Sequence, residues 1–186
     1  GELPFFGQVS RRNLNAFYRA SFSKADIANI RSGYVDYMRS IIPENCSPRF
    51  LLDKMPGNYS WVGLFLRIFP EGKVIFCLRD PIDNCLSMWQ QNFTQPHRYT
   101  YYFEDLVEAY RQHQRLLRMW SEKFGPAQFM VSNYEELIEN QELGSRRLLD
   151  FLGLPWSSEV LDFHENQRKV GTASYWQVRQ KIYSTS

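Results

Sequence analysis

Residues 73–93 have the sequence KVIFCLRDPIDNCLSMWQQNF, and this stretch decides the fold. Residues 73–78 are mostly aliphatic, β-branched or aromatic, which is typical of a short buried strand. Asp80 can cap a helix that follows at once, so Arg79 lies where a strand ends and a helix begins. An arginine beside a helix N-terminus is well placed to hold a phosphate. The residues alone leave a second interpretation open, in which Arg79 pairs with Asp80 or Asp83 on a solvated edge.

Strand-like and helix-like segments alternate on both sides of this stretch. Each crossover is long enough to join parallel strands, so the sequence predicts an α/β fold in which helices flank a parallel sheet. Asn133 is expected to cap one helix, with Glu136 at the capping-box position. We expect strands over 49–53, 73–78 and 128–132, and further helices over 24–42, 58–69, 81–93, 102–124 and 142–152.

Polar residues follow each predicted strand where it ends. Ser87 lies about two turns into the helix after Arg79. The carboxyl ends of parallel strands meet at one edge of a sheet, and ligands bind there. The sequence therefore predicts a ligand site built from Asp53 and Lys54, Arg79 and Asp80, and Ser132, Asn133 and Tyr134.

Composition places limits on the partners of the chain. The 186 residues fit one domain, and a net charge of +2 gives no signal for nucleic acid. No apolar run reaches the ~18 residues of a membrane span. The chain has three cysteines, an odd number, and their spacing does not match that of metal ligands: Cys46, Cys77 and Cys85. We therefore expect buried thiols in a reducing, cytoplasmic compartment.

Several blocks of the sequence, taken in order, resemble the sulfotransferases. The similarity is to the bacterial branch that resembles tyrosylprotein sulfotransferase and often follows tetratricopeptide repeats. The blocks are GELPF at 1–5, DKMP at 53–56, FP at 69–70, RDP at 79–81 with Ser87, NYEEL at 133–137, FLGLPW at 151–156, and TAS at 172–174 with QVR at 177–179.

This resemblance implies a P-loop-like sulfotransferase fold and a nucleotide donor, 3′-phosphoadenosine 5′-phosphosulfate (PAPS). Arg79 and Ser87 match the pair that binds the 3′-phosphate of the donor, and Tyr134 matches a tyrosine that contacts it. Ser174 and Arg179 match a segment that folds back over the nucleotide, although Lys181 stands nearby where a proline is common. The chemistry that the resemblance implies requires no metal.

The same resemblance assigns the residues of the reaction. Sulfation would transfer the sulfuryl group of PAPS to an acceptor hydroxyl on a peptide tyrosine, a sugar or another molecule. Lys54 matches the lysine beside the transferring group. In the tyrosylprotein enzymes two acidic residues follow the glycine, and the second is taken as the base. Here Glu2 occupies the first of these positions and Leu3 the second, so Glu2 falls beside the family's base. Glu2 is therefore expected as the base, with a structural or acceptor-binding role as the alternative. The acceptor and the oligomeric state are not legible from the sequence.

One family feature has no counterpart in this sequence. The family grips the 5′-phosphosulfate with a Gly-rich loop after its first strand, and the chain begins at Gly1, after that loop. We therefore expect residues 1–186 to form a single partial domain, truncated at the N-terminus, that turns over donor poorly by itself. The alternatives are a non-catalytic module that binds a nucleotide bisphosphate or a partner protein, and, ranked last, a nucleotide or nucleoside kinase.

Overall fold

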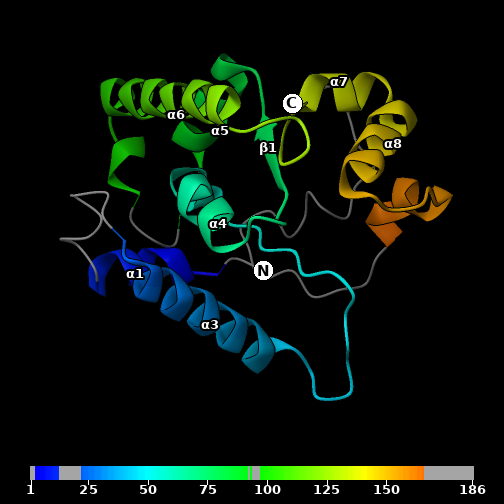
Figure 1. The fold of residues 1–186 in the computed structure, drawn as a ribbon. Coiled ribbons are helices and arrows are strands. Elements are labelled where there is room, and N and C mark those ends of the chain that lie inside the picture. The colour runs from blue at the N-terminus through cyan, green and yellow to red at the C-terminus, as the bar shows by residue number, and fades with distance from the viewer. Residues whose placement is uncertain (1–2, 13–21, 92, 94–96, 166–186) are drawn as a thin grey trace. The chain divides into compact units, whose positions relative to one another are not determined.

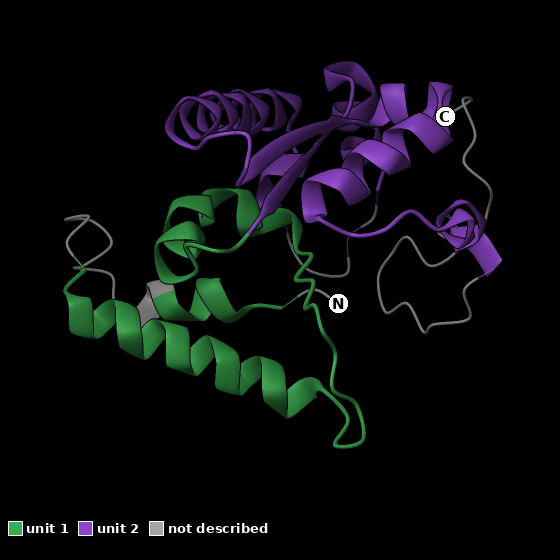
Figure 2. Ribbon diagram, turned by 45° about the vertical axis from the view of Figure 1, so that its right-hand side comes forward, with its two compact units in different colours: residues 1–72 green, residues 73–186 purple. Residues whose placement is uncertain are grey.

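The computed structural model describes residues 3–12, 22–91, 93 and 97–165. The chain divides into two compact units, residues 1–72 and 73–186, which Figure 2 colours separately. Each unit is described by itself below.

The first unit is helical. It contains α1 (Phe5–Arg12), α3 (Lys24–Ile41), the 3₁₀ helix η1 (Pro56–Ser60) and α4 (Val62–Ile68). Ser23 caps α3 in a capping box with Asp26, which explains why the helix begins there. Side chains at helical spacing on α3 pack with residues of α1 and α4, and this core consists of Leu3, Phe6, Ile30, Tyr34, Met38, Leu64 and Ile68.

The second unit contains a parallel sheet. Strands β1 (Val74–Leu78) and β2 (Phe129–Asn133) pair in a register that runs from Val74 opposite Phe129 to Leu78 opposite Asn133. Between them the chain forms α5 (Pro81–Gln90), the 3₁₀ helix η2 (Arg98–Thr100) and α6 (Phe103–Lys123). After β2 come α7 (Tyr134–Glu139), α8 (Gln141–Leu152) and the 3₁₀ helix η3 (Ser158–Glu165).

Helices lie on both sides of this sheet, as the sequence predicts. Figures 1 and 2 show α5 and α6 on one side of β1 and α7 and α8 on the other. On the α6 side, the ring of Phe76 lies 4.8 Å from that of His113 and 5.9 Å from that of Phe129. Leu106 of α6 is fully buried. The prediction of an α/β fold is confirmed.

The strand predicted over residues 49–53 is wrong. This segment has no strand hydrogen bonding in the structure, and Leu52 is 81% exposed. An apolar run forms a strand only when its backbone can hydrogen-bond to a neighbouring strand, and among the described residues no strand pairs with this segment. The predicted helix over 58–69 is also corrected, because the chain there forms η1 followed by the shorter α4.

Two further expectations are corrected at the level of single side chains. Asn133 is the N-cap residue of α7, but its amide donates a hydrogen bond of 2.8 Å to Glu136 Oε1 and does not cap the backbone. Cys85 is buried as expected, whereas Cys46 and Cys77 are exposed free thiols. Among the described residues, no helix combines the length and the apolar character needed to cross a bilayer.

Candidate functional site

The carboxyl ends of β1 and β2 bring two predicted site residues together. Since Leu78 pairs with Asn133, the residues that follow, Arg79 and Tyr134, leave the sheet side by side. The guanidinium carbon of Arg79 lies 5.5 Å from the centre of the Tyr134 ring. This distance is typical of a cation–π interaction. The interaction keeps the positive charge of Arg79 at the edge of the sheet where the two strands end.

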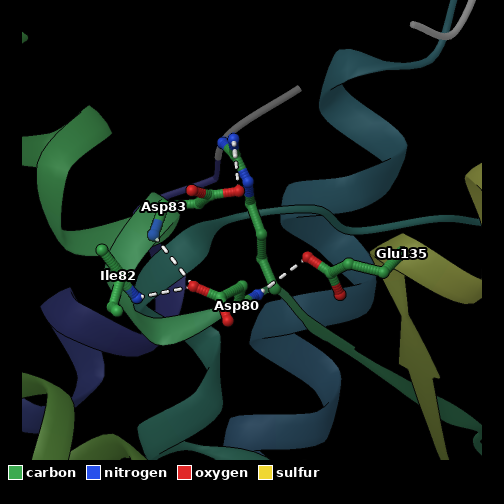
Figure 3. A network of polar contacts seen from close by, with 5 residues as sticks. Asp80, Ile82, Asp83 and Glu135 are labelled. Atoms are coloured by element: carbon green, nitrogen blue, oxygen red, sulfur yellow. Dashed lines mark hydrogen bonds and ion pairs between the residues drawn. The ribbon is translucent and has the colours of Figure 1, made fainter. Parts of the chain in front are cut away.

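Asp80 begins α5 by capping it. Its Oδ1 accepts hydrogen bonds from the backbone N–H groups of Ile82 (2.8 Å) and Asp83 (3.1 Å), and Figure 3 shows both. These N–H groups are the ones a helix N-terminus would otherwise offer to an anion. Because Asp80 already occupies them, an anion at this edge depends on the Arg79 side chain more than on the helix terminus.

Arg79 also contacts a carboxylate. Its Nη2 lies 3.8 Å from Asp83 Oδ2, and the two side chains are 28% and 45% exposed. The ion pair of the alternative interpretation is therefore present. Charge-assisted hydrogen bonds are about 2.7–2.9 Å long, so a phosphate oxygen could contact Arg79 more closely than Asp83 does. Exposed ion pairs contribute roughly 0–1 kcal/mol, which makes this pair easy to displace.

Glu135 links the ends of the two strands, a contact that the sequence motifs do not predict. Its Oε1 accepts a hydrogen bond of 2.8 Å from the backbone N–H of Asp80 (Figure 3). The contact ties the start of α5 to the start of α7. Its only signal in the sequence is position, since Glu135 comes two residues after the end of β2.

Tyr110 of α6 has a raised pKa, chiefly because it is buried. A hydrogen bond from Gln114 opposes this shift, and the charges of Asp80 and Glu135 add smaller effects in the upward direction. The Tyr110 hydroxyl accepts this hydrogen bond of 2.9 Å from the side-chain amide of Gln114. Three acidic side chains thus lie at this edge: Asp83 pairs with Arg79, and one oxygen each of Asp80 and Glu135 accepts backbone N–H groups.

Ser87 is exposed on α5. It lies one helical turn beyond Asp83, at the i+4 spacing that places two residues on the same helix face. Arg79 pairs with Asp83, so its guanidinium lies near the helix face that carries both Asp83 and Ser87.

Lys54 and Asp53 belong to the first unit. Lys54 is exposed and follows no strand, while the Asp53 side chain is half-buried. The Tyr34 hydroxyl donates a hydrogen bond of 3.0 Å to Asp53 Oδ2. Burial raises the pKa of Asp53, against the opposing effect of hydrogen bonds from Tyr34 and Asn58. The remaining predicted site residues, Glu2, Ser174 and Arg179, lie outside the described residues.

A small cavity lies beside the carboxyl end of β2. Its volume is about 70 Å³, and it is lined by residues of β2, α7 and α8, among them Ser132, Asn133 and Arg147. Ligand pockets for molecules of nucleotide size are about 300–1,000 Å³. This cavity is too small for a nucleotide, and Arg79 is not among its lining residues.

The chain is similar to known proteins in sequence and in fold. A family model described as "Sulfotransferase family" matches residues 7–158. An uncharacterized protein of Aquifex aeolicus is 36% identical over 156 residues, which are 82% of this chain and 20% of that protein. Cytosolic sulfotransferase 14 of Arabidopsis thaliana is 28% identical over 102 residues, which are 48% of this chain and 29% of that enzyme.

A solved structure shares the fold. The sulfotransferase domain from the curacin biosynthetic pathway matches with a TM-score of 0.58 at 19% identity, over 82% of this chain and 53% of that domain. This chain therefore spans between a fifth and about half of the length of these relatives. Since the family match covers most of the sequence, the chain belongs to the sulfotransferase family.

Proposed function

We propose that this chain is part of an enzyme that transfers a sulfuryl group from PAPS to an acceptor hydroxyl, with residues 1–186 forming part of one sulfotransferase domain. The family match, which runs through both compact units, supports the proposal. The observation that carries it is the meeting of Arg79 and Tyr134 at the carboxyl ends of two paired parallel strands.

The described residues at this edge suit the 3′-phosphate of the donor. Arg79 offers a planar fork of N–H donors that a phosphate can accept in pairs. Ser87 offers a hydroxyl on the helix face that begins at Asp83. The Tyr134 ring lies against the guanidinium and limits where it can point. Arg79 and Ser87 are therefore proposed to hold the 3′-phosphate, with Tyr134 beside them.

Lys54 and Glu2 are proposed to serve the reaction itself. PAPS, when bound, supplies a sulfuryl group on a good leaving group. An ammonium at Lys54 would stabilise the negative charge that grows on the leaving oxygen. A carboxylate at Glu2 would take the proton of the acceptor hydroxyl, a contribution of about 10²–10⁴-fold. Ser174 and Arg179 complete the proposed donor site. The acceptor is proposed as a hydroxyl compound such as a peptide tyrosine or a saccharide.

The cysteines bear on where the protein works. Cys46, Cys77 and Cys85 are all free thiols, which agrees with a reducing compartment. We include a cytoplasmic location in the proposal on this ground.

The function is tested by measuring how Arg79 variants bind adenosine 3′,5′-bisphosphate and adenosine 5′-monophosphate by calorimetry. We expect Arg79→Ala to weaken bisphosphate binding about 10–100-fold, since a charge-assisted contact of 1.5–3 kcal/mol is lost. Arg79→Lys should recover part of this loss, because a lysine keeps the charge but not the fork. Neither substitution should change binding of the 5′-monophosphate.

Arg111→Ala is the matched control. Arg111 forms an ion pair of 3.9 Å with Glu108 on α6, in the same unit, so its removal changes the net charge equally. Unchanged bisphosphate binding in Arg79→Ala, or an equal loss in Arg111→Ala, would contradict the 3′-phosphate assignment. Sulfuryl transfer from PAPS to phenol or sugar acceptors, even at a low rate, would count against the non-catalytic alternative.

A further inference from the structure

One hydrogen bond joins helix α3 to the segment that carries Lys54. The Tyr34 hydroxyl donates to Asp53 Oδ2 at 3.0 Å, and the two residues are 19 positions apart in the sequence. Asp53 directly precedes Lys54, which the proposed function places beside the transferring group. The contact therefore acts on the backbone that leads into Lys54.

Tyr34 is held rigidly by its neighbours. The residue is 6% exposed. Its ring is stacked on Phe6 at 5.4 Å and meets Phe5 and Phe69 edge-on at 5.1 Å and 5.4 Å. A ring enclosed in this way has a fixed orientation, so its hydroxyl presents a hydrogen bond at a fixed point on the surface of the core.

The chain around Asp53 alternates between inside and outside. Leu52 and Lys54 are exposed, whereas Asp53 and Met55 are half-buried, and Met55 has extended backbone angles of φ −142° and ψ 130°. In an extended chain, neighbouring side chains point to opposite faces. Half-buried Asp53 and exposed Lys54 follow this alternation.

The residues before Asp53 are more exposed than Asp53 itself. Phe50, Leu51 and Leu52 are 53%, 54% and 81% exposed. The segment thus arrives at Asp53 with its large side chains in solvent, and Asp53 is where it turns toward the core. Burial raises the pKa of Asp53 and of Tyr34, as expected for two groups that share a hydrogen bond away from water.

We propose that Tyr34 and Asp53 are positioning residues, whose hydrogen bond fixes the direction in which the Lys54 ammonium is presented to the 5′ end of the donor. This inference rests on the proposed function, because it takes Lys54 as the lysine of the transferring group. Neither Tyr34 nor Asp53 contacts the donor in this account, and their effect passes through the backbone to Lys54.

The test compares two ligands that differ at one end. Adenosine 3′,5′-bisphosphate carries the 5′-phosphate that Lys54 would contact, and adenosine 3′-monophosphate lacks it. Calorimetry on the protein should show Tyr34→Phe weakening bisphosphate binding about fivefold, the equivalent of roughly one hydrogen bond. Binding of the 3′-monophosphate should stay within about twofold. In Lys54→Ala, where the ammonium is gone, adding Tyr34→Phe should cause no further loss.

Two controls keep this test decisive. Tyr37→Phe removes a hydroxyl from the same helix beside Phe5, and it should leave both affinities unchanged. Asp53→Asn keeps an oxygen that can accept from Tyr34, so it should bind nearly as the wild type, whereas Asp53→Ala should behave as Tyr34→Phe. The Asp53 pair supplies the answer even if Tyr34→Phe does not fold.

The outcomes separate the inference from the function on which it rests. Equal weakening of both ligands by Tyr34→Phe, or a loss that adds in full to that of Lys54→Ala, would show a general structural role and overturn the inference. If Arg79→Ala weakens both ligands while Tyr34→Phe and Asp53→Ala weaken neither, the inference fails and the proposed function stands. If Arg79→Ala also has no effect, both fail.

Discussion

At the scale of single residues, a ligand phosphate and the carboxylate of Asp83 would compete for Arg79. The guanidinium lies 3.8 Å from Asp83 and 5.5 Å from the centre of the Tyr134 ring. A phosphate that binds Arg79 must displace or share this carboxylate. Since Asp83 is 45% exposed, solvent weakens the existing ion pair, and the competition should cost the ligand little.

Removing this competitor should therefore strengthen the site. We expect Asp83→Asn to tighten binding of adenosine 3′,5′-bisphosphate by about 1.5–5-fold, which is the range of an exposed ion pair of 0.2–1 kcal/mol. The gain should shrink as salt rises, because screening weakens the repulsion between Asp83 and the phosphate. Isothermal titration at two salt concentrations measures both effects.

Glu108→Gln is the matched control, since Glu108 pairs with Arg111 at 3.9 Å on α6. It removes one exposed carboxylate from the same unit and should leave the affinity unchanged. Weaker binding in Asp83→Asn would mean that Asp83 orients Arg79 for the ligand and does not compete with it.

At the scale of elements, the start of α5 sets the position of Arg79. Asp80 caps the helix through two backbone N–H groups, and Glu135 accepts the N–H of Asp80 itself. The end of β1, the start of α5 and the start of α7 are thus joined by hydrogen bonds. Arg79 lies inside this junction, so its backbone is held from both sides.

The cap should contribute measurable stability. Asp80→Ala removes the acceptor for Ile82 and Asp83 but keeps the N–H that Glu135 accepts. We expect the free energy of unfolding to fall by about 1 kcal/mol, within the range of 0.5–2 kcal/mol for lost caps. Urea denaturation followed by circular dichroism measures the change.

Asp80→Asn provides the comparison, because asparagine is also a strong N-cap residue and should lose only a few tenths of a kcal/mol. An Asp80→Ala variant as stable as the wild type would show that α5 does not need its cap. Bisphosphate binding in Asp80→Ala should fall less than in Arg79→Ala, since the guanidinium is retained.

Most of the elements were predictable because their signals are local. Ser23 with Asp26 marks the start of α3, Asp80 marks the start of α5, and the left-handed Gly153 (φ 72°) ends α8. The prediction of a strand over 49–53 was wrong because a strand needs a partner strand, and the apolar content of a segment does not show whether it has one. The prediction that Asn133 caps α7 was wrong for a similar reason, because the sequence does not show which partner a side chain binds. Its amide donates a hydrogen bond to Glu136 and makes no capping hydrogen bond with the backbone of α7.

The candidate site was predictable in part for the same reason. The meeting of Arg79 and Tyr134 follows from two strand ends in one parallel sheet, which the alternation of elements indicates. The link from Glu135 to Asp80 depends on the strand register and on a side-chain rotamer, and neither can be inferred from spacing. The hydrogen bond from Tyr34 to Asp53 joins separate elements and gives no sequence signal at all.

At the scale of the whole molecule, the family match extends through both compact units. Arg79, Ser87 and Tyr134 lie in the second unit, and Lys54 with its proposed anchor lies in the first. The proposed roles of these residues predict that Arg79 variants change the contribution of the 3′-phosphate to binding and that Lys54 variants change the contribution of the 5′-phosphate.

The most direct test of the account is the ratio of two dissociation constants in the unmodified protein, for adenosine 3′,5′-bisphosphate and for adenosine 5′-monophosphate. The two ligands differ only in the 3′-phosphate that Arg79 and Ser87 are proposed to hold. We predict that the bisphosphate binds about 10–100-fold more tightly, as expected for a phosphate held by an arginine fork and a hydroxyl. Equal affinity for the two nucleotides would contradict the account.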